Sequence, residues 1–249
     1  MSRQNESILE PRALLIIVFL TADGVKARKN KFGPSKTGVM DMAEKRVSFE
    51  ADGLKLEGLM EELPGGKGVV ITHPHPLYGG TMHNNVVKAV AAAYQNKGYS
   101  TLRFNFRGVE KSEGDFDNGV GEQEDVNAAL KYLSQLDKKQ LDLAGYSFGA
   151  WVIALGLEKY EKVNKVVMIS PPVDFIDFGF LKYNPKIQLV ISGSRDDIGG
   201  YKNIQRILPK WNEKAAFKVI DGADHFYSGR EAELEEIIGE FLGRSAYSE

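Results

Sequence analysis

Short apolar segments alternate with longer amphipathic segments along most of the chain. Two alternating segments, residues 47–49 and 54–59, flank Asp52 and Gly53, a pair that is typical of a hairpin turn. The apolar segment at 68–72 lacks this alternation, as expected of a strand that is covered on both faces. The pattern therefore predicts an antiparallel hairpin followed by a buried strand.

After this strand, predicted helices and strands alternate to the end of the chain. The predicted strands cover residues 99–104, 141–144, 163–169, 187–192 and 216–220. The predicted helices have apolar side chains at helical spacing and lie around residues 86–98, 126–133, 150–157, 204–208 and 234–242. Repeated strand-helix units predict an α/β fold: one mostly parallel sheet with helices on both faces and antiparallel strands at its N-terminal edge.

The chain divides into three parts by this pattern. Residues 1–43 are an N-terminal extension, 44–244 form one α/β domain, and 245–249 are a C-terminal tail. The extension contains an unbroken apolar run at 13–20, shorter than the ~20 residues that a membrane-spanning helix needs. Acidic residues dilute the positive charge that precedes this run, which disfavours a signal peptide. We predict a cytoplasmic protein, with secretion through residues 1–22 or a start at Met40 or Met42 as alternatives.

Composition excludes several classes of function. The 32 Lys and Arg residues against 34 Asp and Glu give a net charge of −2, so charge does not favour a nucleic-acid or membrane partner. The absence of cysteine removes disulfides, thiolate catalysis and Cys-ligated zinc. Residues 73–76 read His-Pro-His-Pro where a nucleotide-binding domain would carry a Gly-rich loop. We predict a small-molecule acyl substrate and no cofactor, and a homodimer stays an open option.

One motif places a serine between a predicted strand and a predicted helix. Gly145-Tyr146-Ser147-Phe148-Gly149 has the G-x-S-x-G spacing. The glycines allow the strand and the helix to approach closely, and the sharp turn exposes the serine hydroxyl. The same turn places the Phe148 N–H at a helix N-terminus, where it can donate to a developing oxyanion. The motif therefore predicts a nucleophilic serine.

A serine nucleophile needs a base and a carboxylate that orients the base. His225 follows the last predicted strand, and Asp196 and Asp197 follow the preceding one. Reactive groups gather beyond the carboxyl ends of parallel strands, so these segments should meet the Ser147 turn. The order Ser, Asp, His along the chain is that of hydrolases built on this turn. We favour Asp196, with Asp197 as the alternative. Weaker candidates follow the strand before these, namely Asp174 and Asp177.

The loop after residues 68–72 should supply a second oxyanion donor. Pro74 and Pro76 have no N–H, which leaves the backbone N–H groups of His75 and Leu77. The histidines of this loop have no His or Glu partner that would complete a metal site, so we predict no metal. The predicted substrate contacts are three aromatic side chains, Tyr78, Tyr146 and Phe226.

Several motifs occur together in a fixed order. They are HPHP at 73–76, YGGTM at 78–82, LRFNFRG at 102–108, GDFD at 114–117, AGYSFGA at 144–150, PPV at 171–173 and GADHF at 222–226. Over residues 44–244 the chain resembles the α/β-hydrolase superfamily, and in particular small bacterial predicted hydrolases related to the dienelactone-hydrolase and esterase branches. The resemblance implies Ser147 as nucleophile, Asp196 as acid and His225 as base. Glu110 departs from the pattern, because a glycine is usual there.

The resemblance implies an α/β-hydrolase fold and acyl-transfer chemistry. Residues 170–186, where hydrolases of this architecture often insert a lid, are too few for a large lid domain. We therefore expect a carboxylesterase that acts on small soluble acyl esters through an acyl-enzyme. The alternatives are a thioesterase, a lactone or dienelactone hydrolase or an acyltransferase with the same triad, and a non-catalytic binding protein with this fold. The apolar side chains expected to form either a shallow pocket wall or core are Phe175, Ile176, Phe178, Phe180 and Leu181.

Overall fold

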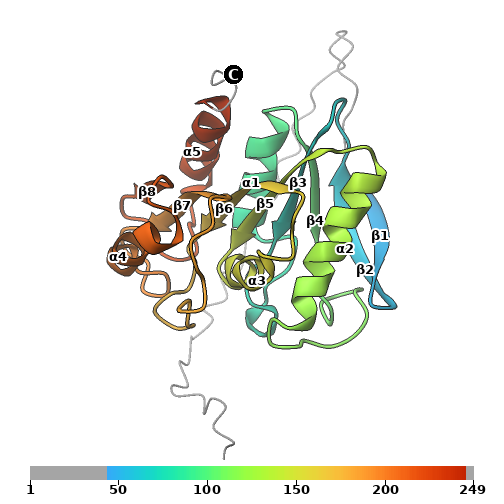
Figure 1. Ribbon diagram of the computed structural model, residues 1–249, viewed down its shortest axis with the longest axis horizontal. Coiled ribbons are helices and arrows are strands. Elements are labelled where there is room, and N and C mark those ends of the chain that lie inside the picture. The colour runs from blue at the N-terminus through green and yellow to red at the C-terminus, as the bar shows by residue number, and fades with distance from the viewer. Residues whose placement is uncertain (1–43, 245–249) are drawn as a thin grey trace, which may run out of the picture. The chain divides into compact units, whose positions relative to one another are not determined.

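The computed structural model describes residues 44–244 (Figure 1), and the predicted extension 1–43 and tail 245–249 lie outside this part. Here, the strands form one sheet in the order β1-β2-β4-β3-β5-β6-β7-β8. The strands are β1 (Lys45–Ala51), β2 (Leu54–Glu61), β3 (Lys67–Thr72), β4 (Ser100–Phe104), β5 (Gln140–Tyr146), β6 (Val163–Ile169), β7 (Ile187–Gly193) and β8 (Ala216–Ile220). The helices are α1 (Asn85–Gln95), α2 (Gly121–Gln135), α3 (Phe148–Gly156), α4 (Tyr201–Asn212) and α5 (Glu231–Arg244), with a short 3₁₀ helix, η1 (Pro76–Tyr78).

The strand directions confirm the predicted sheet. Strand β2 runs antiparallel to both of its neighbours, β1 and β4, whereas every pair from β4 to β8 is parallel. Asp52 and Gly53 between β1 and β2 both have positive φ angles, 51° and 77°. Positive φ at both central residues is what a tight hairpin turn with the twist of the flanking strands requires. The Asp-Gly pair therefore directs the local chain reversal.

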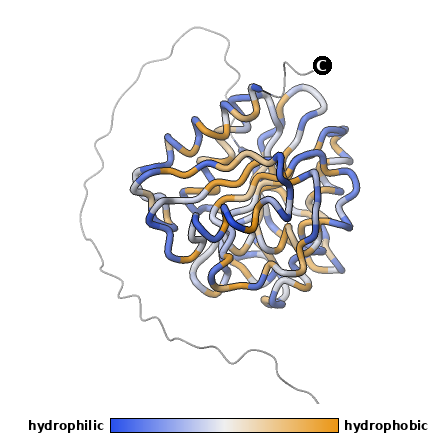
Figure 2. The backbone as a smooth tube through the Cα atoms, turned by 60° about the vertical axis from the view of Figure 1, so that its left-hand side comes forward, coloured by the Kyte–Doolittle hydropathy of each residue, from blue (hydrophilic) through white to orange (hydrophobic). Residues whose placement is uncertain are grey.

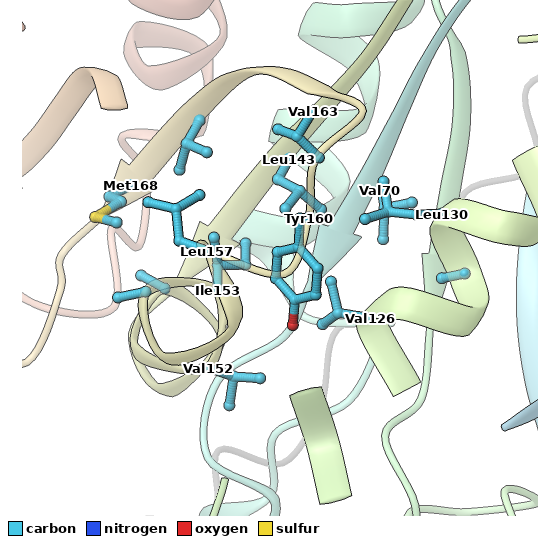
Figure 3. Packing of buried hydrophobic residues seen from close by; sticks show 14 of the residues in the cluster. Val70, Val126, Leu130, Leu143, Val152, Ile153, Leu157, Tyr160, Val163 and Met168 are labelled. Carbon is cyan, nitrogen blue, oxygen red and sulfur yellow. The ribbon is translucent and has the colours of Figure 1, made fainter. Parts of the chain in front are cut away.

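Helices cover both faces of the sheet, as predicted. Successive residues of a buried strand point to opposite faces, so Val70 joins the core under α2, α3 and α4 while Val69 joins the core under α1 and α5. In Figure 1, α2 and α3 lie in front of the sheet and α1 lies behind it. Figure 2 shows apolar segments gathered in the central strands and hydrophilic segments around the outside. Figure 3 shows Val126 and Leu130 of α2, Ile153 of α3 and Leu157 directly after α3 within the core under α2, α3 and α4.

Helix α4 is longer than the sequence predicts. The predicted helix 204–208 stops before Pro209, which lacks an N–H, but α4 continues to Asn212. The last turn has tertiary contacts that hold it in place. Trp211 is buried, and the Asn212 side chain donates a hydrogen bond of 2.8 Å to the carbonyl of Ile187. These contacts offset the hydrogen bond lost at the proline.

The segment between β6 and β7 forms turns and contains no lid domain. Phe178 is buried, and its ring centroid lies 5.3 Å from that of Trp211, so Phe178 belongs to the core. Phe180 stacks on Phe178, whereas Phe175 is exposed. The apolar side chains predicted here therefore divide between core and surface. Among residues 44–244, no additional domain therefore covers the carboxyl ends of β5 and β8.

A carboxylate lies inside the core on the face under α1. Asp142 in β5 is fully buried, and neither of its carboxylate oxygens has a hydrogen-bond partner among the described residues. Burial raises the pKa of Asp142 to about 7, although the nearby charges of Lys165 and Lys67 offset part of the effect. The native state therefore favours the protonated acid, and ionising it in place costs free energy.

We expect Asp142→Asn to stabilise the protein at pH 8. A carboxyl with a raised pKa contributes its stability below its unfolded value of 3.8 and loses it as the pH rises through 7. Removing the charge should raise the free energy of unfolding by up to about 4 kcal/mol at pH 8, since each pKa unit corresponds to about 1.4 kcal/mol. Urea denaturation from pH 4 to 8 measures this. The unfolding free energies of the wild type and Asp142→Asn should become similar near pH 4. A difference between them that does not change with pH would contradict a raised pKa of Asp142.

Candidate active site

Three residues that are far apart in sequence meet beyond the carboxyl ends of the strands. Ser147 lies in the turn between β5 and α3, Asp196 follows β7, and His225 follows β8. The Ser147 Oγ lies 2.9 Å from Nε2 of His225, and Nδ1 of His225 lies 3.0 Å and 3.1 Å from the two carboxylate oxygens of Asp196. All three side chains are largely buried, and Ser147 keeps 7% of its surface exposed. The structure thus brings together the three residues that the sequence singles out.

The turn at Ser147 is strained and needs both of its glycines. Ser147 has φ 55° and ψ −120°, in the region that L-residues rarely adopt. A Cβ on Gly145 would lie 2.7 Å from the backbone nitrogen of Ala150, and a Cβ on Gly149 would lie 2.5 Å from Oγ1 of Thr72. Side chains at either position would therefore separate β5, α3 and the end of β3. The G-x-S-x-G spacing follows from this close approach.

The structure distinguishes the two adjacent aspartates after β7. Asp196 is buried against His225, whereas Asp197 is exposed. The Oδ1 atom of Asp196 also accepts hydrogen bonds from the N–H groups of Ile198 (2.9 Å) and Gly199 (2.7 Å). Burial by itself would raise the pKa of Asp196, but its hydrogen bonds and its electrostatic interaction with the facing imidazole of His225 more than offset it and lower the pKa. Asp196 is therefore held as a carboxylate facing the imidazole.

The weaker carboxylate candidates have other partners. Asp174 accepts hydrogen bonds from the N–H of Gly200 and the side chain of Asn203, and Asp177 accepts one from the N–H of Gly179. These contacts fold the turns between β6 and α4. Neither carboxylate reaches His225.

The contacts of His225 define which nitrogen has the proton. Its Nδ1 faces the Asp196 carboxylate, which can only accept, so the proton lies on Nδ1. Nε2 is then free to accept the hydroxyl proton of Ser147. An imidazole between an alcohol and a carboxylate can take the alcohol proton and is stabilised once it becomes charged. The arrangement has the geometry of a nucleophile, a general base and an orienting acid.

Tyr146 is not available as the predicted substrate contact. It is only 2% exposed, and its hydroxyl donates a 2.7 Å hydrogen bond to the backbone carbonyl of His225. Its ring also lies against the imidazole of His225, with the centroids 5.5 Å apart. Successive side chains of β5 point to opposite faces of the sheet, and the Tyr146 side chain points to the face covered by α1 and α5. The ring therefore lies in the core on that face. Tyr146 therefore supports the loop that holds His225.

The predicted oxyanion donors differ in their availability. Phe148 begins α3, and the first N–H groups of a helix have no intrahelical acceptor. The N–H of His75 has no acceptor among residues 44–244. The N–H of Leu77 instead donates to Nδ1 of His75 at 3.2 Å and is not free in this conformation. Of the three predicted oxyanion donors, the N–H groups of Phe148 and His75 thus have no acceptor among residues 44–244.

His73 has a role that the sequence did not reveal. Its Nε2 accepts a 3.0 Å hydrogen bond from the N–H of Phe106, and its Nδ1 donates to the carbonyl of Pro74 at 2.7 Å. The ring is fully buried, and burial lowers the pKa of His73 to about 4. His73 is therefore a neutral tether between the loop after β3 and the loop after β4. The only sequence signal is a histidine placed directly after an apolar strand and before a proline.

Tyr78 and Phe226 lie at the surface beside these groups. Tyr78 is 85% exposed and its ring lies 4.8 Å from that of His75, while Phe226 is 50% exposed and its ring lies 5.8 Å from that of His225. Both are accessible to a ligand. Within residues 44–244, no group of three or more His, Asp or Glu side chains is arranged to hold a metal ion. None of the helices in this range has the length and hydropathy that a bilayer crossing requires.

We expect the buried His73 to make the protein sensitive to acid. A histidine whose folded pKa is lowered contributes its full stability above the unfolded value of 6.5 and loses it as the pH falls toward 4. The difference between the unfolded and the folded pKa of His73 corresponds to about 3 kcal/mol of unfolding free energy, which is lost as the pH falls from 6.5 toward 4. Chemical denaturation of the wild type and His73→Asn at pH 7 and pH 4.5 measures it. The destabilisation caused by the substitution should shrink at pH 4.5, and an equal difference at both pH values would refute the assignment.

Comparisons with known proteins show the family to which the chain belongs. The alpha/beta hydrolase domain family matches residues 68–238. The protein RP471 of Rickettsia prowazekii is 36% identical over 189 residues, which cover 72% of this chain and 79% of that protein. An alpha-beta serine hydrolase homologue from Coxiella burnetii has 34% identity and a TM-score of 0.75, covering 82% of this chain and 99% of its own.

A second similar structure is described as having no lid. XC6422 from Xanthomonas campestris, described as an α/β serine hydrolase without a lid, is 27% identical with a TM-score of 0.75, and the match covers 84% of this chain and 98% of XC6422. The family match spans most of the chain, and the two solved structures cover 82% and 84% of it with a similar fold. This chain therefore belongs to the alpha/beta hydrolase domain family.

Proposed function

We propose that this protein is a serine carboxylesterase that hydrolyses small soluble acyl esters. In this proposal Ser147 is the nucleophile, His225 is the general base and Asp196 orients and stabilises the imidazole. The observation that supports it is the continuous hydrogen-bonded path from Ser147 Oγ through His225 to Asp196, at 2.9 Å and 3.0 Å. Hydrogen bonds of this length allow proton transfer without movement of the side chains.

The reaction would proceed in two steps through an acyl-enzyme. Ser147 Oγ bonds to the ester carbonyl carbon while its proton passes to Nε2 of His225. The N–H groups of Phe148 and His75 stabilise the oxyanion, and collapse of the tetrahedral intermediate expels the alcohol, which takes the proton from His225. Water then repeats the sequence, with its proton passing to His225 and returning to Ser147 as the acid leaves.

The surroundings of Ser147 favour a short acyl group. No lid domain covers the site in the described part of the chain, and Phe178 of the segment between β6 and β7 is packed into the core. Exposed apolar side chains beside the catalytic groups, such as Tyr78 and Phe226, offer a shallow surface in place of a deep tunnel. Thioester or lactone hydrolysis and acyl transfer to an alcohol use the same groups, so a substrate panel separates these activities.

Replacing Ser147 by alanine should abolish ester hydrolysis and covalent labelling. A fluorophosphonate probe reacts with an activated serine, so the wild type should gain one adduct that peptide mapping places on Ser147. Ser147→Ala should show neither the adduct nor turnover of p-nitrophenyl acetate above the buffer rate. A folded wild type that the probe does not label would favour a non-catalytic binding protein and overturn the proposal.

The two neighbouring aspartates provide a matched pair. Asp196→Asn should lower kcat by about 10³–10⁴, because an amide neither stabilises the imidazolium nor holds the productive tautomer. Asp197→Asn changes an exposed side chain and should leave kcat at the wild-type value. Steady-state kinetics with p-nitrophenyl butyrate measures both. Equal losses in the two variants would contradict the assignment of Asp196.

Short acyl chains should be preferred over long ones. Because the described part of the chain contains no lid domain that could cover a long acyl chain, methylene groups beyond the exposed surface are expected to remain in water and add no binding energy. On a matched p-nitrophenyl series, kcat/KM for acetyl or butyryl esters should exceed that for the decanoyl ester by about tenfold or more, equivalent to at least about 1.4 kcal/mol. A rising kcat/KM with chain length would reverse this part of the proposal.

A further inference from the structure

The imidazole of His75 organises the loop that follows β3. It caps η1 by accepting the Leu77 N–H on Nδ1 at 3.2 Å. The backbone carbonyl of His75 also accepts hydrogen bonds from the N–H groups of Tyr78 and Gly80, each at 3.1 Å. The loop is tight, because a Cβ on Gly80 would lie 2.1 Å from the carbonyl oxygen of Pro74. Both the side chain and the carbonyl of His75 are thus used to fold the loop, while its own N–H is left free.

The same imidazole connects this loop to the start of α3. Its ring centroid lies 4.8 Å from that of Phe148, 5.0 Å from that of Phe116 and 4.8 Å from that of Tyr78. The Phe148 ring is buried and also contacts Phe106 and Trp151, so it is a rigid support. Phe148 directly follows Ser147 and has the other free N–H. The His75 ring is therefore the side-chain contact between the two segments that bear the proposed oxyanion donors.

The hydrogen bond from Leu77 also sets the state of the ring. An N–H can donate only to an unprotonated ring nitrogen, so Nδ1 has no proton and the proton of the neutral imidazole lies on Nε2. Burial lowers the pKa of His75, which favours this neutral form. The ring thus combines two properties, a surface that packs in a tilted arrangement against the Phe148 ring and an acceptor that caps η1.

We propose that the His75 imidazole is a positioning residue, which holds the His75 N–H at a fixed place relative to the Phe148 N–H. This inference rests on the proposed function, because it concerns the oxyanion donors of that reaction. The imidazole itself takes no part in bond making. Its effect is on the transition state, since a donor displaced by about 1 Å still allows substrate to bind but stabilises the oxyanion poorly.

Three substitutions separate the two properties of the ring. His75→Asn keeps an acceptor that can cap η1 but removes the ring. His75→Phe keeps a ring that can pack against Phe148 but removes the acceptor, and His75→Ala removes both. All three keep the backbone N–H. His83→Ala, a partly exposed histidine outside the hydrogen-bonded path, is the matched control.

We expect His75→Ala to lower kcat for p-nitrophenyl butyrate by about 10²-fold, as for a reacting group misplaced by about 1 Å, with KM unchanged. His75→Asn and His75→Phe should each recover part of the loss, and His83→Ala should match the wild type. Thermal unfolding of each variant checks that the fold is retained. Wild-type kcat in the Asn and Phe variants, or a rise in KM with kcat unchanged, would overturn the proposal.

Fluorophosphonate labelling distinguishes failure of this inference from failure of the proposed function. If the wild type is not labelled at Ser147, the proposed function fails. If the wild type is labelled and His75→Ala is labelled at the same rate, the serine is active and the positioning role of His75 is wrong. Slower labelling of His75→Ala, still located on Ser147, supports both proposals.

Discussion

The close approach of β5, α3 and the end of β3 is the constraint on which the site depends. Only glycine fits at positions 145 and 149, because any side chain there would collide with backbone or with Thr72. The same closeness forces Ser147 into a strained conformation, which the packed sheet and helix maintain. It also brings the N-terminus of α3 next to the loop after β3. One steric condition therefore sets the position of Ser147, the position of the Phe148 N–H and the distance between Phe148 and His75.

Histidine tautomers form a second level of organisation around this turn. Three of the four histidines in the sequence, His73, His75 and His225, have defined protonation patterns because each faces a group that can only donate or only accept. In His73 and His225 the proton lies on Nδ1, whereas in His75 it lies on Nε2. Backbone N–H groups select the pattern in the two histidines of the loop after β3, His73 and His75, and a carboxylate selects it in His225. The site is thus preorganised before any substrate arrives.

Glu110 shows how a local departure from a family pattern can be tolerated. It has a φ of 50°, the left-handed region in which glycine is comfortable, and glycine is usual at this position in the hydrolases that the sequence resembles. Its carboxylate accepts a 2.7 Å hydrogen bond from the side chain of Asn105, which in turn accepts the N–H of Met82. These contacts offset part of the backbone strain. The backbone conformation persists although the residue has changed.

The sequence by itself determined the order of elements, the hairpin, the serine turn and the Ser, Asp, His order, because each depends on local periodicity or on the steric freedom of glycine. It also placed Asp196 and His225 after neighbouring strands. Only the tertiary structure separated buried Asp196 from exposed Asp197, turned Tyr146 into the core and engaged the Leu77 N–H. It alone revealed the tether at His73 and the unpaired carboxylate of Asp142. Burial and hydrogen-bond partners arise from segments far apart in the chain, and no local pattern contains that information.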